Sequence, residues 1–157
     1  MSGGPFAHHG GLTDADLRSA GLIDADDVAA LLCELGYPCD VEDAARRIRA
    51  ILDNDRQALV VARVDGAVAG LVALDFMYYL PLDTVTCRIT ALVVSASARG
   101  QGLGRQLLRE AERRARAGGA ARIELTSGSQ RADAHAFYKA CGFTGGTVRF
   151  IKRLGDA

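Results

Sequence analysis

The chain has 157 residues, nearly half of them hydrophobic, and its 19 basic residues balance 19 acidic ones. That length is enough for one domain with a sizeable core. Zero net charge gives no general attraction to nucleic acid or to an anionic membrane, and no run of 18 apolar residues is present to span a bilayer. The composition therefore predicts one soluble domain with neither nucleic acid nor a membrane as its partner.

The first residues are rich in glycine and carry no periodic pattern. We expect residues 1–12 to form a flexible leader and residues 13–157 to form a single domain. The pair His8-His9 lies in this leader and gives no basis for a metal site. The cysteines lack Cys-x-x-Cys spacing and are predicted to be buried free thiols in a reducing, cytoplasmic compartment: Cys33, Cys39, Cys87 and Cys141.

Two helices are predicted in the first third of the chain. Apolar residues recur at helical spacing over 24–35 and over 41–52, and Gly36 and Pro38 separate the two segments. A short strand over 17–22 precedes them. The sequence therefore predicts a strand followed by a helix–turn–helix.

A β-hairpin is predicted next. Apolar, β-branched runs over 58–64 and 67–76 are joined by Asp65-Gly66, a strong turn signal. The segment 78–81, Tyr-Tyr-Leu-Pro, is predicted to be a loop with exposed aromatic side chains, which serve either surface packing or contact with a substrate or a second subunit.

The second half alternates strands with helices. Strands are predicted over 85–94, 122–126 and 148–154, a helix from the glycine-rich loop to Gly118-Gly119, and a helix over 133–140. Simple alternation places four residues on one face of the first of these strands: Cys87, Ile89, Ala91 and Val93. The predicted fold class is α/β, with a mixed, mostly antiparallel twisted sheet flanked by helices.

The most informative stretch is the glycine-rich loop after the strand over 85–94. Gly100, Gly102 and Gly104 keep side chains away from the start of a helix, where backbone N–H groups lack acceptors and the helix dipole is positive. Arg99 and Arg105 add positive charge. The loop is therefore predicted to bind phosphate, although it lacks the spacing of a dinucleotide-binding fold and the lysine of a Walker loop.

Two segments resemble those of a known family. Residues 99–104, Arg-Gly-Gln-Gly-Leu-Gly, resemble the acyl-CoA loop of the GNAT family of N-acetyltransferases, and residues 134–143 resemble its closing Ala-x-x-Phe-Tyr-x-x-x-Gly-Phe segment. The resemblance implies the GNAT fold, acetyl-CoA as co-substrate, no metal, and direct attack by a primary amine of a small molecule or peptide. It implies that Tyr138 protonates the leaving thiolate. The implied acetyl-CoA-binding residues are Leu92, Val93, Val94, Arg99, Gly100, Gln101, Gly102, Leu103, Gly104, Arg105, Arg131, Ala134 and Tyr138.

The sequence departs from the family pattern at two positions. Thr90 stands where many relatives carry a glutamate base, and Arg131 stands in place of the usual asparagine. Glu124, His135 or water are the alternatives for the base. An acyl-CoA-binding regulatory module without catalysis therefore stays open as a second function, and a nucleotide-phosphate binder as a third. The apolar, aromatic stretch 76–82 and the family's frequent pairing predict a homodimer.

Overall fold

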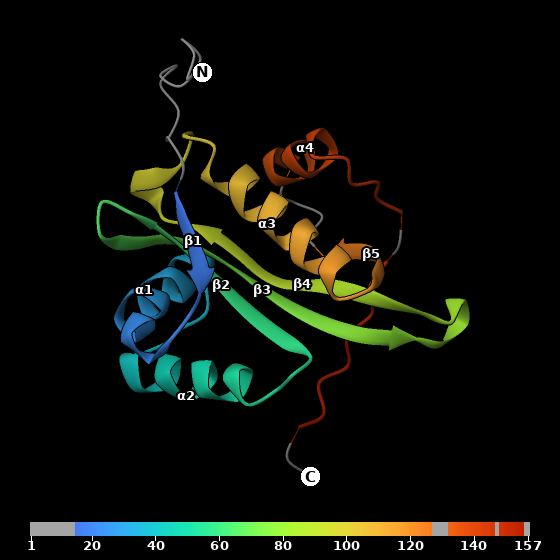
Figure 1. Cartoon of the computed structure of the whole chain (residues 1–157), viewed down its shortest axis with the longest axis horizontal. Helices are drawn as coiled ribbons and strands as arrows, with labels where there is room; N and C mark the ends of the chain where they lie inside the picture. The colour runs from blue at the N-terminus through green and yellow to red at the C-terminus, as the bar shows by residue number, and fades with distance from the viewer. Residues whose placement is uncertain (1–14, 127–131, 147, 156–157) are drawn as a thin grey trace.

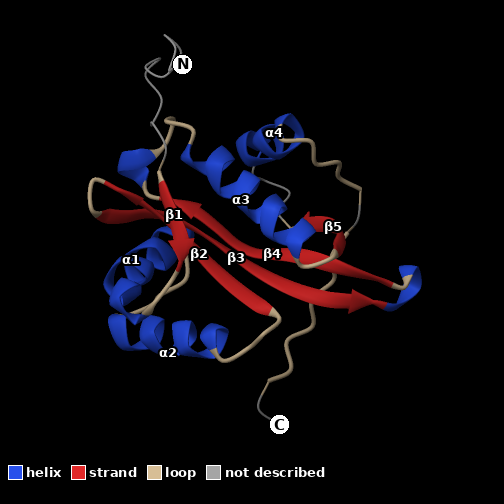
Figure 2. Cartoon of the chain, viewed as in Figure 1, coloured by secondary structure: helices blue, strands red, loops and turns tan. Residues whose placement is uncertain are grey.

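The computed structural model describes residues 15–126, 132–146 and 148–155 (Figure 1). Five strands form one sheet in the order β1-β2-β3-β4-β5; β1 to β4 are antiparallel neighbours, and β5 runs parallel to β4. The predicted mixed, mostly antiparallel sheet flanked by helices is confirmed (Figure 2). The elements are β1 Asp16–Ser19, α1 Ala25–Leu35, α2 Val41–Leu52, β2 Gln57–Val64, β3 Ala67–Tyr79, β4 Thr84–Val94, α3 Leu103–Ala117, β5 Ala120–Leu125 and α4 Ala132–Ala140.

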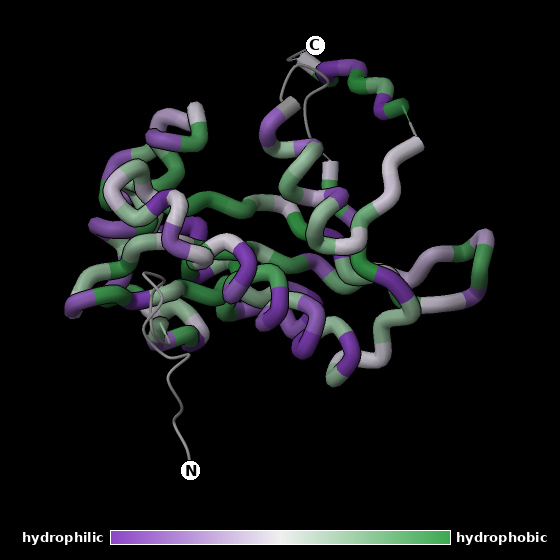
Figure 3. The backbone as a smooth tube through the Cα atoms, turned by 90° about the horizontal axis from the view of Figure 1, so that it is seen from above, coloured by the Kyte–Doolittle hydropathy of each residue, from purple (hydrophilic) through white to green (hydrophobic). Residues whose placement is uncertain are grey.

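Different helices cover the two faces of the sheet, which we call the α1 face and the α3 face. Side chains alternate along β3, so that Leu71 and Ala73 pack in the cluster of α1 and α2, and Val72 and Leu74 pack in the cluster of α3 and α4. The hydrophobic strands run between helices of mixed hydropathy (Figure 3). Burying apolar side chains on both faces makes the sheet the rigid centre of the molecule.

Local hydrogen bonds fix the two helices on the α1 face. Gly36 takes a left-handed conformation (φ 109°) that ends α1. Asp40 accepts a 2.7 Å hydrogen bond from the Asp43 amide and Asp43 accepts one in return, which begins α2 with a capping box. Before α1, buried Asp24 forms a 2.8 Å ion pair with Arg18 of β1, which lowers the pKa of the Asp24 carboxyl.

Strand β4 contains one extra residue, Thr90. Its neighbours Ile89 and Ala91 lie opposite consecutive residues of β3, so Thr90 forms a β-bulge. Cys87 and Ile89 therefore pack in the cluster of α3, whereas Ala91 and Val93 pack in the cluster of α1. The prediction that these four residues share one face is wrong, because alternation reverses wherever a ladder gains a residue.

Two predicted strands also differ from the structure. β1 ends at Ser19 and is followed by a short 3-10 helix, Leu22–Asp24, rather than continuing to residue 22. Residues 148–155 form no strand with any described part of the sheet, so the predicted last strand over 148–154 is wrong. No backbone ladder joins this segment to a described strand, and Phe150 is 91% exposed within it.

The predicted aromatic loop and buried thiols need correction as well. Tyr78 and Tyr79 end β3, and the turn is a 3-10 helix over Leu80–Leu82. All four cysteines are free, but Cys33 is exposed and only Cys87 is fully buried, which raises the pKa of its thiol to about 11. The predicted leader over 1–12 lies outside the described residues. Within the described ranges, no helix is long and apolar enough to cross a membrane.

Candidate active site

The second half of β4 has one unpaired edge. The parallel ladder between β4 and β5 ends where Ile89 meets Leu125. Beyond that point residues 90–94 pair with β3 alone among the described strands. Backbone N–H and C=O groups along this edge are therefore free of a neighbouring strand and can bind an extended ligand.

Leu92, Val93 and Val94 lie on this edge. Their side chains belong to the two hydrophobic clusters, Val93 on the α1 face and the other two on the α3 face. A ligand at the edge would therefore meet their backbone atoms. That arrangement agrees with the predicted role of these three residues and is also the arrangement of an ordinary core strand.

The glycine-rich loop connects β4 to α3. A 3-10 helix over Ala96–Ala98 follows the strand, Gly100 and Gly102 have positive φ angles of 78° and 86°, and Gly102 is the N-cap of α3. Residues with a Cβ adopt the left-handed backbone conformation of Gly102 only at a cost in free energy. The first N–H groups of α3 have no intrahelical acceptor, and together with the helix dipole they favour an anion.

The side chains of this loop have different surroundings. The Arg99 Nε donates a 3.2 Å hydrogen bond to the Val94 carbonyl, and the Arg99 guanidinium lies 3.9 Å from Glu34. Arg105 is exposed and has no ion pair with any residue that the structure describes. Gln101 is exposed, and Leu103 is 1% exposed in the core. Of the two arginines of this loop, Arg105 is therefore the one whose charge no described carboxylate compensates, and it is available to a phosphate.

Helix α4 packs directly on the start of α3. A Cβ atom at Gly104 would lie 3.3 Å from the Phe137 ring, so glycine allows this close approach. Tyr138 is half-buried, and the centroid of its ring lies 5.6 Å from that of Phe137 and 6.1 Å from that of Phe143. Ala134 is 9% exposed. Arg131 lies outside the described residues.

The candidate bases lie on separate elements. Thr90 is exposed at the bulge, and its Oγ1 lies 3.5 Å from the Ala73 carbonyl oxygen. Glu124 is half-buried on β5, and His135 is half-buried on α4. The ladder places Glu124 one residue before β4 and β5 separate, so its carboxylate is attached beside the free edge.

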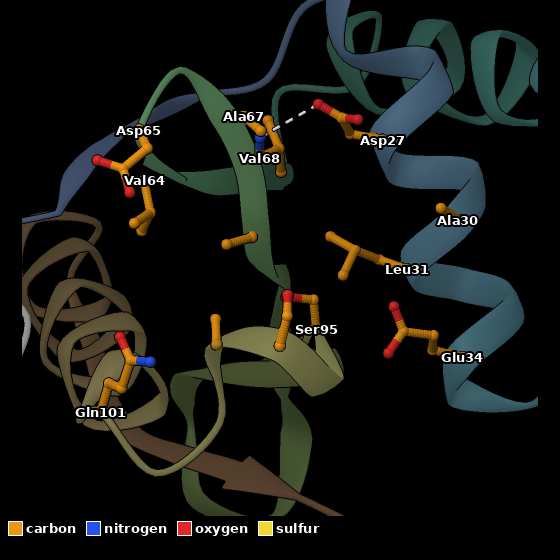
Figure 4. A pocket seen from close by; sticks show the side chains of 13 residues that line it. Asp27, Ala30, Leu31, Glu34, Val64, Asp65, Ala67, Val68, Ser95 and Gln101 are labelled. Carbon is orange, nitrogen blue, oxygen red and sulfur yellow. Dashed lines mark hydrogen bonds between the residues drawn. The ribbon is translucent and has the colours of Figure 1, made fainter.

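An acidic pocket of about 370 Å³ lies between α1, the β2–β3 turn and the glycine-rich loop (Figure 4). Asp27 and Glu34 of α1 line it, together with Asp65 of the β2–β3 turn and Ser95 and Gln101 of the loop. Two of these acids hold the fold together, because Asp27 accepts a hydrogen bond from the Val68 amide and Glu34 one from the Ala96 amide. Its negative charge makes this pocket unsuitable for the phosphates of a nucleotide.

The described residues contain no cluster of three or more histidine, cysteine or acidic side chains able to hold a metal ion.

Sequence reasoning missed Asp75 and Arg88, which lie opposite each other on β3 and β4 next to the bulge. The sequence places Arg88 two residues before Thr90, but only the end of the β5 ladder at Leu125 shows that Arg88 lies beside the free edge.

Comparison with known proteins decides the family. The model of the acetyltransferase (GNAT) family matches residues 26–143. The chain belongs to the GNAT family. A curated aminoalkylphosphonate N-acetyltransferase from Salmonella typhimurium (strain LT2) is 36% identical over 140 residues, which cover 88% of this chain and 91% of that protein. The chain is therefore an N-acetyltransferase, and enzymes of this family use acetyl-CoA as co-substrate.

Solved structures agree on the fold. A transcriptional regulator from Bacillus halodurans C-125 is similar with a TM-score of 0.82 and 25% identity, over 90% of this chain and all of that one. A GNAT family acetyltransferase from Staphylococcus aureus gives a TM-score of 0.77 at 24% identity, over 89% of this chain and 98% of that one. The second likeness is evidence for the GNAT fold alone.

Proposed function

We propose that this enzyme transfers the acetyl group of acetyl-CoA directly to the primary amine of a small acceptor that carries a phosphonate or a similar anion. The observation that carries the proposal is the 36% identity, over most of both chains, to an aminoalkylphosphonate N-acetyltransferase. The free edge of β4 beside the glycine-rich loop supports it, since both lie where an extended thioester with phosphates at one end would bind.

In this proposal the pyrophosphate of acetyl-CoA binds the backbone N–H groups of residues 100–105. Arg105 supplies an uncompensated positive charge there. The pantetheine arm follows the free edge of residues 92–94 and hydrogen-bonds to their backbone. A backbone N–H near the bulge then stabilises the oxyanion that develops on the thioester carbonyl.

The chemistry needs placement and one proton donor. The neutral amine attacks the thioester carbon, the new C–N bond forms, and the C–S bond breaks to release the CoA thiolate. Tyr138 gives its phenolic proton to that thiolate, and the proton lost by the amine restores the phenol through solvent. The position of Tyr138 on α4, which packs against the start of α3, supports this role.

A panel of amines tests the proposed acceptor. Release of the CoA thiol is measured with 2-aminoethylphosphonate, 3-aminopropylphosphonate, β-alanine, propylamine and a peptide with a free α-amine. We expect the aminoalkylphosphonates to give the highest kcat/KM. Preference for the peptide would contradict the proposed acceptor class, and binding of acetyl-CoA without turnover of any amine would favour the regulatory module.

We also propose a cytoplasmic homodimer. The turn between β3 and β4 extends past β5 in Figure 1, and its apolar side chains are exposed, with Leu80 at 77% and Leu82 at 55%. Such a patch supports contact with a second copy. Four free thiols support a reducing compartment. Light scattering that gives the mass of one chain at high protein concentration would contradict the dimer.

A further inference from the structure

A row of three charged residues crosses the α1 face of the sheet beside the bulge. The ladders place Asp75 of β3 opposite Arg88 of β4, and Arg88 opposite Glu124 of β5. Ala73, the previous residue of β3 on this face, still packs in the cluster of α1 and α2. The row of Asp75, Arg88 and Glu124, here called the charged row, therefore begins where the hydrophobic cover of the α1 face ends.

Asp75 makes no side-chain hydrogen bond or ion pair with a described residue, and the same is true of Arg88. Arg88 is half-buried, yet its guanidinium makes no hydrogen bond or ion pair with any residue in the described part of the chain. Its neighbour Glu124 instead lies 3.5 Å from Arg122. Because the Arg88 guanidinium has no close partner, an anion that contacts it gains charge-assisted hydrogen bonds, and these must outweigh repulsion from Asp75 and Glu124 on the neighbouring strands.

Arg122, on the same face, has hydrogen-bond, ion-pair and aromatic partners within the protein. In addition to the Glu124 ion pair, its Nε donates a 3.1 Å hydrogen bond to the Thr86 hydroxyl, and its guanidinium carbon lies 4.2 Å from the centroid of the Tyr79 ring. Arg122 therefore has a structural role, and the contrast leaves Arg88 as the arginine available to a ligand.

A second guanidinium reaches this region from the C-terminal segment. Arg149 donates a 2.8 Å hydrogen bond to the hydroxyl of Thr126, the residue directly after β5 and two residues beyond Glu124. Arg149 is exposed and forms no ion pair with a described carboxylate. Arg88 and the Arg149 guanidinium thus both lie beside the end of the β4–β5 ladder, and neither forms an ion pair with a described carboxylate.

We infer that Arg88 and Arg149 bind the anionic group of the acceptor and so select amines that carry a phosphonate. This inference rests on the proposed function. Arg88 lies two residues, about 7 Å along the strand, from the bulge at which the thioester would react. A short alkyl chain between amine and phosphonate suits that separation, and two guanidinium groups match the several oxygens of a phosphonate.

Substitution of Arg88 tests this inference through a split between two acceptors. For Arg88→Gln we expect KM for 2-aminoethylphosphonate to rise about 10- to 100-fold with kcat within about 3-fold, because the lost group binds the anion and not the reacting atoms. Kinetics with propylamine should stay within about 2-fold. Arg88→Lys should restore part of the affinity, and Arg149→Gln, at an exposed position, should raise KM about 3- to 10-fold.

Arg116→Gln is the matched control. Arg116 is an exposed arginine of α3, on the opposite face, paired with Glu112 at 3.7 Å. Arg116→Gln should leave kcat and KM unchanged for both acceptors. If Arg88→Gln lowered kcat/KM equally for both acceptors, the inference would be overturned, because Arg88 would then act on the fold or on the thioester.

Calorimetry with methylphosphonate in the presence of CoA gives a readout that needs no turnover. Binding that Arg88→Gln weakens supports the inference even if no amine is acetylated, in which case only the proposed acceptor function fails. Binding of equal strength in the wild type and Arg88→Gln, or none in the wild type, overturns the inference while leaving the acetyl transfer to other amines intact.

Discussion

The two halves of β4 differ in the pairing of their edges. Residues 85–89 lie between the ladders to β3 and β5 and carry the fully buried Cys87. Residues 90–94 keep β3 but have no partner on the other edge in the described structure. A strand paired on both edges has no backbone groups left for a ligand, so only the half of β4 beyond the end of the β5 ladder can offer an edge to the proposed acetyl-CoA site.

Deletion of Thr90 should have the largest effect on this division. Without the extra residue, Ile89 and Ala91 become neighbours that already face opposite sides of the sheet, so the ladder with β3 becomes regular and the protein should fold. The free edge moves by about one residue, roughly 3 Å, relative to the glycine-rich loop. We expect kcat/KM to fall about 1,000-fold.

The Thr90→Ala variant separates the bulge from the side chain. It keeps the extra residue and removes only a hydroxyl whose contact with the Ala73 carbonyl is long, at 3.5 Å. Its kcat/KM should stay within about 3-fold of wild type. Equal losses in both variants, with native circular dichroism, would show that the hydroxyl and not the bulge matters.

Substitution of Gly102 tests the loop that the free half of β4 leads into. Gly102→Asp places a negative charge at the start of α3, so we expect the Kd for CoA to rise about 100-fold by calorimetry. Gly119→Asp is the control, because both glycines have positive φ angles, 86° and 79°, and open space at the Cβ position. Unchanged CoA affinity in a folded Gly102→Asp protein would exclude the proposed phosphate site.

The hydroxyl of Tyr138 tests the chemistry proposed beside the free half. Tyr138→Phe keeps the ring contacts with Phe137 and Phe143. We expect acetyl-CoA affinity to stay close to wild type and kcat to fall about 10- to 100-fold, because a phenol and a thiol have nearly balanced proton affinities. Turnover as fast as wild type would make Tyr138 a packing residue, with water as the proton donor.

Substitution of Cys87 tests the paired half and should have the smallest effect on activity. Cys87→Ser puts a hydroxyl in a fully buried position, so the free energy of unfolding should fall by about 1–3 kcal/mol in urea titrations. The value of kcat/KM should stay within about 2-fold. A large loss of activity at full occupancy of the folded state would mean that the paired half also takes part in catalysis.

The sequence by itself determined most of the elements and the family. Helical periodicity and Gly36 predicted α1 and α2, the Asp65-Gly66 turn predicted the β2–β3 hairpin, and the glycines before α3 predicted the loop. These signals are local, because the residues that specify a turn or a helix end are the residues that form it. The two short motifs were sufficient to predict the family that the comparisons confirm.

Only the tertiary structure decided which side chains share a face and which edges are unpaired. The bulge at Thr90 reversed the predicted alternation because a register shift depends on the partner strand. The segment 148–154 has the composition of a strand but pairs with no strand in the described structure. Arg88 resembles any other arginine in the sequence. Its proposed role follows from the positions of Glu124 and Arg122 on β5, more than thirty residues away, because an ion pair depends on distance in space rather than along the chain.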